Sequence, residues 1–323
     1  MTHTDHASSA GLYVGLMSGT SVDAIDSALV FCNGDQFELR ATHQAVIPSQ
    51  TRELVAAISR PGPDEIERMG ALDRELGRLF ASATVADFRR RDIAAGGEGA
   101  PLAPAFHTAA FAAQGVNRAV VNIGGIANIS VLEGQDLHTG FDTGPGNTLL
   151  DHWIQRHRGE AYDRDGQWSA AGKVLPELLQ RLLQYPYFAA RGPRSTGKEA
   201  FNLAWLDDCL GRQQPAPVDV QATLAELTAS SIAHDIRECA VPIDEVYICG
   251  GGAHNRDLME RLRQKLSPAS LGSTAQLGME PDWVEAVAFA WLASRTLDGL
   301  AGNAPAVTGA SGVRVLGGIF TGG

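Results

Sequence analysis

The sequence predicts an α/β protein of two similar lobes, each a mixed sheet flanked by helices, with a cleft between the lobes. Apolar strand-like runs alternate with amphipathic helical runs, a pattern typical of sheets that are covered on both faces. The order strand, turn, strand, strand and then helices occurs twice, beginning near residue 11 and again near residue 119. The length of 323 residues also suits about two domains.

The first half predicts three strands, two helices and a short fourth strand. Two apolar runs on either side of the polar turn SGTSVD are typical of a β-hairpin, and a third run follows them. Helical periodicity comes next, and the second helix opens on a Pro-Asp start. The expected strands cover residues 11–17, 24–32, 37–47 and 84–88, and the expected helices cover residues 49–60 and 64–80.

The second half restarts this order after a Gly- and Pro-rich loop over residues 89–106. We therefore expect a first lobe at residues 1–107, completed by the C-terminal segment 300–323, and a second lobe at residues 108–299. The expected strands cover residues 119–124, 126–133, 136–144 and 245–252, and the expected helices cover residues 147–158, 176–184, 201–210, 223–239, 255–266 and 281–297.

The composition excludes several classes of partner. Acidic residues outnumber basic ones by 37 to 26, and the net charge of −11 argues against nucleic acid or an anionic membrane. No apolar run approaches roughly 18 residues, and the N-terminal residues lack the basic flank and apolar core of a signal peptide. The four cysteines form no CxxC pair and have no histidine at zinc spacing, so we expect a cytoplasmic protein without disulfides or structural zinc.

The 36 glycines are the compositional anomaly, because they make up roughly one residue in nine against a typical ~7%. Several groups of them lie beside a strand-like run, where glycine allows a positive φ or a close approach of the backbone. Tight turns are one interpretation. The repeated placement favours backbone amides that cradle a ligand.

The first candidate motif is LMSGTSVDAID, at residues 16–26. Ser18, Gly19, Thr20 and Ser21 offer consecutive backbone N–H groups and three hydroxyls, which suit the oxygens of a phosphate chain. Asp23 follows, and a carboxylate near phosphates can hold a hydrated Mg²⁺ through water. The alternative is an ordinary hydroxyl-rich hairpin turn.

Two further motifs lie in the second lobe. NIGGIANIS places Gly124 and Gly125 in a hairpin that matches SGTS by its position in the lobe. GFDTGPGN places Asp142 at the end of a strand, where an aspartate can act as general base toward a hydroxyl or water. An ordinary turn cap is the equally weighted alternative for Asp142.

The last motif is ICGGGAHN, in which Gly250, Gly251 and Gly252 end a strand. The G-x-G-x-x-G spacing of a dinucleotide fingerprint is absent, so a Rossmann dehydrogenase is disfavoured. A flat glycine shelf beneath an adenine or ribose is the alternative.

Together these segments resemble the anhydro-N-acetylmuramic acid kinases. The resemblance rests on the ordered motifs GLMSGTSVDAIDSALV, ADFRRRDIAAGGEGAPLAPAFH, VVNIGGIANIS, GFDTGPGN, YDRDGQWSAAG, RSTGKEAFN, YICGGGAHN and PDWVEAVAFAWLA. It implies two ribonuclease-H-like lobes of the acetate and sugar kinase, Hsp70 and actin superfamily. It also implies ATP and Mg²⁺, and the opening of the 1,6-anhydro ring of anhydro-N-acetylmuramic acid with phosphorylation of its 6-oxygen. The product would be N-acetylmuramate 6-phosphate, in peptidoglycan recycling.

The resemblance also implies roles for single residues. Asp142 matches the general base of the family, and Asp23 is a candidate for holding the metal through water. The chain is expected to be either a monomer or a homodimer. Thr143, Asn147 and Glu285 are candidates for the substrate. The residues matched to nucleotide binding are Ser18, Gly19, Thr20, Ser21, Val22, Asp23, Ala24, Ile25, Asp26, Gly124, Gly125, Gly250, Gly251 and Gly252.

Two departures from the family pattern stand out. Ala24 replaces the second glycine of the GTSxDGxD hairpin, which has a small effect unless that residue needs a positive φ. More importantly, a family stretch of roughly forty-odd residues is missing between Ala83 and Thr84. In the family it carries a strand and loop on the sugar side. The missing stretch motivates one alternative, an impaired nucleotide-binding pseudoenzyme. A kinase of the same superfamily that acts on another small sugar is a second alternative.

Overall fold

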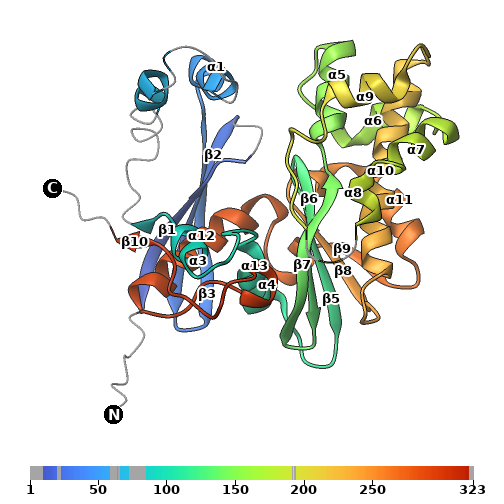
Figure 1. The fold of residues 1–323 in the computed structure, drawn as a ribbon. Helices are drawn as coiled ribbons and strands as arrows, with labels where there is room; N and C mark the ends of the chain where they lie inside the picture. Colours follow the sequence, from blue (N-terminus) through green and yellow to red (C-terminus); the bar gives the residue numbers. More distant parts are fainter. Residues whose placement is uncertain are drawn as a thin grey trace, which may run out of the picture. The chain divides into compact units, whose positions relative to one another are not determined.

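The computed structural model describes residues 10–19, 23–58, 64, 66–72, 85–190, 192 and 194–319. The chain divides into two compact units, whose elements are labelled in Figure 1. Residues 285–299, predicted in the second lobe, group instead with the N-terminal residues. Unit 1 comprises Met1–Gly99, Glu285–Asn303 and Ala310–Gly323, and unit 2 comprises Ala100–Val284 and Ala304–Gly309.

Unit 2 contains a five-stranded mixed sheet in the order β7-β6-β5-β8-β9. Strands β5, β6 and β7 are antiparallel neighbours, whereas β8 and β9 run parallel to β5. Strand β5 is a nearly continuous apolar run because the centre of the sheet is buried on both faces. The strands are β5 (Asn117–Ile123), β6 (Ile126–Glu133), β7 (Asp136–Pro145), β8 (Glu245–Cys249) and β9 (Ser270–Ser273).

The helices of unit 2 follow the predicted order, with additions. The longest, α10, begins at Pro217, earlier than predicted, because proline suits the first turn of a helix. The predicted strand 245–252 ends at Cys249, and the glycines after it form a 3₁₀ turn, Gly251–His254. The helices are α4 (Ala103–Phe111), α5 (Thr148–Arg158), α6 (Gln167–Ala171), α7 (Pro176–Leu183), α8 (Pro186–Ala189), α9 (Leu203–Leu210), α10 (Pro217–Arg237), α11 (Arg256–Leu266) and α13 (Pro305–Thr308).

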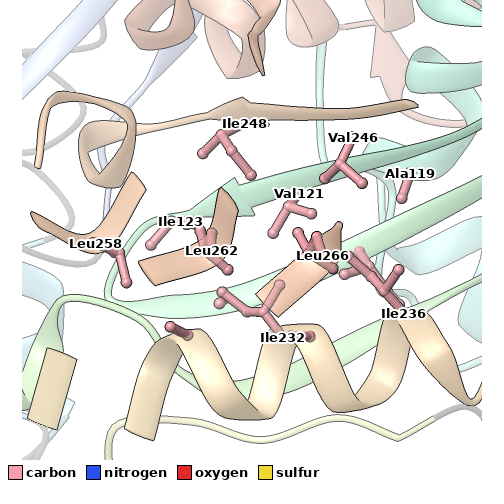
Figure 2. Packing of buried hydrophobic residues seen from close by; sticks show 14 of the residues in the cluster. Ala119, Val121, Ile123, Ile232, Ile236, Val246, Ile248, Leu258, Leu262 and Leu266 are labelled. Atoms are coloured by element: carbon pink, nitrogen blue, oxygen red, sulfur yellow. The ribbon is translucent and has the colours of Figure 1, made fainter. Parts of the chain in front are cut away.

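The core beneath this sheet is formed by β5 and β8 against α10 and α11 (Figure 2). Leu258, Leu262 and Leu266 are four residues apart, so they share one face of α11 and point at the sheet. Val246 and Ile248 are two residues apart on β8, so they lie on the same face of that strand. Both belong to the same buried cluster as the three leucines. This packing holds the ends of β5 and β8 in fixed positions for the turns that follow them.

Unit 1 is smaller. Its three-stranded antiparallel sheet has the order β1-β2-β3, and helix α12 packs against β1 so closely that a Cβ at Gly15 would overlap the carbonyl of Ala286. The predicted strand 84–88 is only two residues long and pairs with the C-terminal β10. Its elements are β1 (Gly11–Met17), β2 (Ala24–Asn33), β3 (Gln36–Val46), α1 (Ser49–Ile58), β4 (Val85–Ala86), α3 (Arg90–Ala94), α12 (Val284–Leu297) and β10 (Gly318–Ile319), and residues 66–72 are helical.

The two units differ at one strand position. In unit 2, β8 lies parallel beside β5, on the edge that β6 leaves open. Among the described residues of unit 1, β1 pairs with β2 alone, and no strand takes the position that corresponds to β8. Leu12 and Val14 on β1 are 62% and 52% exposed. In the part of unit 1 that the structure describes, the sheet thus has no strand at the position where one is predicted to be missing. No helix in the described part of the chain is long and apolar enough to span a membrane.

Candidate active site

The glycine turns of unit 2 meet at one edge of its sheet. Strands β5, β7 and β8 all run in the same direction, so their carboxyl ends lie together. The turn at Gly124 and Gly125 follows β5, Gly146 follows β7, and Gly250–Gly252 follow β8. Ligands of α/β sheets bind at this kind of edge. The structure thus brings together three segments that the sequence had singled out separately.

The turn after β5 is bonded to the start of helix α5. The N–H groups of Gly146 and Thr148 donate to the carbonyl of Gly125 at 2.9 and 3.1 Å, and the N–H of Asn147 donates to Gly124 at 2.8 Å. These bonds satisfy the first donors of α5 with protein carbonyls. Within the described part of the chain, the backbone N–H groups of Gly124 and Gly125 donate no hydrogen bond, so this turn is a better candidate than the start of α5 for binding phosphate oxygens.

Asp142 lies on β7, the edge strand of the sheet, and is held by a distant segment. Its carboxylate Oδ2 accepts a hydrogen bond from the Thr196 N–H at 2.9 Å, and the Ser195 side chain provides another. Burial raises the pKa of Asp142, while the bonds from Thr196 and Ser195 and the charge of Arg194 oppose that rise. A carboxylate with such a pKa, anchored by two donors but with about four acceptor positions, can also accept a proton from a bound water.

Thr143 and Asn147 are placed differently from each other. The Thr143 side chain is fully buried, and its hydroxyl donates to the Ala127 carbonyl at 3.2 Å. The structure therefore leaves no exposed Thr143 hydroxyl for a sugar to contact. Asn147 is partly exposed, and its Nδ2 donates to the Ile123 carbonyl at 3.1 Å. It lies beside the turn after β5.

The three glycines after β8 have different reasons to be glycine. Gly250 has a φ of +74°, and a Cβ there would overlap the Asn122 side chain. At Gly252 a Cβ would overlap the side chain of Ile123. Gly251 is exposed, and the nearest atom to a Cβ there is Asn147 Nδ2 at 3.9 Å. Close packing on β5 therefore explains why Gly250 and Gly252 are glycine, whereas Gly251 is exposed and is not constrained by packing.

The different surroundings of Gly250 and Gly251 predict different outcomes for their substitution by alanine. Gly250→Ala should lower the free energy of unfolding by about 2–4 kcal/mol, through backbone strain and steric overlap. Gly251→Ala should change it by less than about 0.5 kcal/mol and should weaken ATP binding if the nucleotide lies over it. Urea unfolding and calorimetric titration with ATP measure both quantities. Equal destabilisation by the two substitutions would contradict the assignment.

The loop of the YDRDGQWSAAG motif packs on the end of the turn that follows β8. Asp163 accepts hydrogen bonds from the N–H groups of Trp168 and Ser169 at 2.9 and 2.8 Å, which fixes the loop. Gly166 has a φ of +68°, and a Cβ there would overlap Asn255. The Asn255 side chain in turn accepts from the Leu258 N–H at 3.0 Å and caps α11. Sequence reasoning had not assigned a role to these residues, although the motif was visible.

In unit 1 the predicted phosphate hairpin is described only in part. Thr20, Ser21 and Val22 lie outside the described residues. Ser18 and Gly19 directly follow β1, and the Ser18 hydroxyl is buried without a hydrogen-bond partner among the described residues. A buried hydroxyl without a partner carries an energetic cost, which a bound phosphate oxygen would remove.

The acidic end of the hairpin begins β2. Asp23 is exposed, its Oδ1 accepts the Ala24 N–H at 3.1 Å, and its exposure fits a hydrated cation. Asp26 accepts a bond from Gln44 at 2.9 Å. Ala24 and Ile25 are buried at 7% and 2% exposure, so their side chains pack in the sheet.

Two further points concern Ala24 and Glu285. Ala24 pairs with Val46 in extended backbone, where alanine replaces glycine without strain. Glu285 lies in the first turn of α12 and begins the stretch of that helix that belongs to unit 1. The described residues contain no group of three or more histidine, cysteine, aspartate or glutamate side chains arranged to hold a metal.

The strand order of unit 2, with three antiparallel strands followed by two parallel ones, is the ribonuclease-H-like arrangement predicted from the sequence. The glycine turns and the half-buried Asp142 lie at one edge of this sheet. The chain belongs to the anhydro-N-acetylmuramic acid kinase family, because the model of that family matches residues 11–84 and 82–322.

Individual relatives agree with this membership. An anhydro-N-acetylmuramic acid kinase from Shewanella sp. (strain ANA-3) is 45% identical over 96% of this chain and 98% of its own length. Another, from Shewanella oneidensis, is 44% identical over the same shares. Among solved structures, the activator of the 2-hydroxyisocaproyl-CoA dehydratase from Clostridium difficile with bound ADPNP gives a TM-score of 0.47 at 12% identity, and the match covers 88% of this chain and 94% of that chain.

The comparisons also locate the missing segment. The match to the family model breaks into two parts that meet at residues 82–84. The alignment with the Shewanella relative runs over 363 positions, although this chain has only 323 residues, so at least 40 positions of the relative have no counterpart here. The break in the family match falls at the position predicted for the gap, between Ala83 and Thr84.

Proposed function

We propose that this chain is an ATP-dependent kinase that opens the 1,6-anhydro ring of anhydro-N-acetylmuramic acid and phosphorylates its 6-oxygen. The observation that carries the proposal is the carboxylate of Asp142, half-buried at the sheet edge and anchored by the Thr196 N–H. Family membership supports the substrate, since the relatives are named for this sugar.

In the proposed reaction, Asp142 takes a proton from the water that attacks the anomeric carbon of the sugar. The bond from that carbon to the 6-oxygen breaks, and the 6-oxygen receives the γ-phosphoryl group of ATP as ADP leaves. The products are N-acetylmuramate 6-phosphate and ADP. Raising the pKa of Asp142 by burial makes it a stronger base at neutral pH, which suits this role.

For the nucleotide, each unit offers its own candidate groups. In unit 2 we assign phosphate contacts to Gly124 and Gly125, and nucleoside contact to Gly251. In unit 1 we assign phosphate contacts to the hairpin that begins at Ser18, and we propose that Asp23 holds Mg²⁺ through water. When bound, Mg²⁺ would neutralise charge on the phosphates.

The proposed compartment is the cytoplasm. The cysteines are all free, which fits a reducing environment. A homodimer is the alternative to a monomer, and size-exclusion chromatography with light scattering would decide between them.

The pH dependence of turnover tests the role of Asp142. A general base works only when deprotonated, so kcat/KM should fall on acidification through the pKa of Asp142. Since burial raises that pKa, the acid limb should lie above about 3.9, the ordinary aspartate value. An end-point assay of ADP release from about pH 3 to about pH 9, which spans the ordinary aspartate value, measures it. An acid limb at or below the ordinary value would exclude Asp142 as the titrating base.

The direct test of the proposed function is ADP release with and without the anhydro sugar, with the sugar product analysed by mass spectrometry. We expect sugar-dependent ADP release and one phosphorylated, ring-opened product. Binding of ATP without any turnover of this sugar would favour the pseudoenzyme, and turnover of another sugar alone would favour a related kinase.

A further inference from the structure

At Asp142, the outer edge of β7 is covered by a segment that contains Tyr187, Arg194 and Thr196. Tyr187 and Thr196 lie 45 and 54 residues further along the chain than Asp142. The Asp142 N–H donates to the Arg194 carbonyl at 3.0 Å, and its carbonyl accepts from the Tyr187 hydroxyl at 2.6 Å. Both backbone groups that Asp142 directs away from the sheet are therefore satisfied. The same segment brings the donors of Ser195 and Thr196 to the carboxylate.

What fixes this segment is the side chain of Arg194. Its guanidinium lies between two aromatic rings, 5.0 Å from the centroid of Phe141 and 4.9 Å from that of Tyr187. Its Nη2 donates to Asp235 Oδ2 on α10 at 2.6 Å, and its Nη1 donates to the Ala190 carbonyl at 3.0 Å. The side chains of Arg194 and Asp235 are only 10% and 7% exposed.

Two physical properties make this contact specific to arginine. A planar guanidinium can stack on aromatic faces and pair with a carboxylate at the same time, which an ammonium cannot do. Burial by itself would lower the pKa of Arg194, but the hydrogen bond and charge of Asp235 outweigh it and hold that pKa above its ordinary value. The group stays charged, so it also places a positive charge near Asp142.

We propose that Arg194 is the positioning residue that holds residues 194–196 along β7 and thereby fixes the carboxylate of Asp142. It does not touch the reacting atoms. It acts through the Thr196 N–H and the Ser195 hydroxyl, which orient the carboxylate toward the attacking water. This inference rests on the proposed function of Asp142 as general base.

The test compares Arg194→Met with Arg194→Lys and with a matched control, Arg261→Met. Arg261 is also a half-buried arginine of unit 2, paired with Glu226 at 2.8 Å and Asp257 at 2.9 Å, on α10 and α11. Both methionine variants should lose comparable stability. Arg194→Met alone should raise the pKa of Asp142, and with it the acid limb of kcat/KM, by about one unit or more. Arg194→Lys should recover part of this shift, since it restores the charge.

Two readouts do not depend on turnover. Amide hydrogen exchange at Thr196 should speed up at least tenfold in Arg194→Met and stay unchanged in Arg261→Met. Carboxyl ¹³C NMR titration should show the raised pKa of Asp142 directly. Asp235→Asn serves if Arg194→Met does not fold, and should shift both readouts in the same direction. Unchanged exchange and an unchanged pKa would overturn the positioning role. A different result would overturn the proposed function: the variants change the amide exchange of Thr196 and the pKa of Asp142 as expected, but the wild-type protein never turns over the sugar.

Discussion

Asp142→Asn is expected to lower kcat by about 10²–10⁴-fold, the usual contribution of a general base, without unfolding the protein. Asparagine has the same shape and keeps an oxygen that can accept the Thr196 N–H, which now bonds to Asp142 at 2.9 Å. It cannot take the proton of the attacking water. Steady-state kinetics with ATP and the anhydro sugar measure the loss, and ATP affinity should be unchanged.

The same variant has a second, opposite effect on stability. Because burial raises the pKa of Asp142 in the folded protein, the stability that its protonated form contributes is present below about pH 3.9 and is lost as pH rises through the folded pKa. At neutral pH the buried charge is therefore a cost. Asp142→Asn should keep or raise the Tm at pH 7. A lower Tm together with lost activity would mean that Asp142 is structural.

Restoring the missing segment is the change with the second large expected effect. The segment of the Shewanella relative would be inserted between Ala83 and Thr84, where the family match breaks. The resemblance places this segment on the sugar side. A hydrogen bond is worth about 0.5–1.5 kcal/mol, so several recovered contacts should raise kcat/KM for the sugar by about 10²-fold.

Stability should rise as well. No strand of the described residues lies on the outer edge of β1, so an inserted strand would pair there and bury part of Leu12 and Val14, which are now more than half exposed. Covering them should contribute about 1 kcal/mol each. An insert of equal length made of glycine and serine is the control, and it should raise neither kcat/KM nor Tm. Equal effects of both inserts would contradict the account of unit 1.

The central part of the fold could be predicted because its strands carry strong local patterns. Strand β5 is a buried apolar run, and Leu258, Leu262 and Leu266 follow the helical repeat. Strands β9 and β10 escaped prediction, since they have four and two residues and few apolar side chains. They exist because a neighbouring strand offers unpaired backbone groups, which a local pattern does not reveal.

The site divides in the same way. The sequence marks Asp142 as a candidate because it stands beside a Gly-Pro-Gly turn in a known motif, and its role as general base stays a prediction. Its partners could not, because pairing at the free edge of β7 brings Tyr187 and Thr196 from distant parts of the chain. The glycines show a further limit. Sequence grouped Gly250–Gly252 as one ligand shelf, whereas two of them are required by packing on β5.

The central claim is that this chain transfers phosphate from ATP to the 6-oxygen of a ring-opened anhydro sugar, with Asp142 as base. ³¹P NMR of a reaction containing ATP, Mg²⁺ and anhydro-N-acetylmuramic acid tests it most directly. The account predicts a new phosphomonoester resonance that grows in step with ADP, requires the sugar, and is absent with Asp142→Asn. Release of inorganic phosphate alone, or ADP formation that does not depend on the sugar, would contradict it.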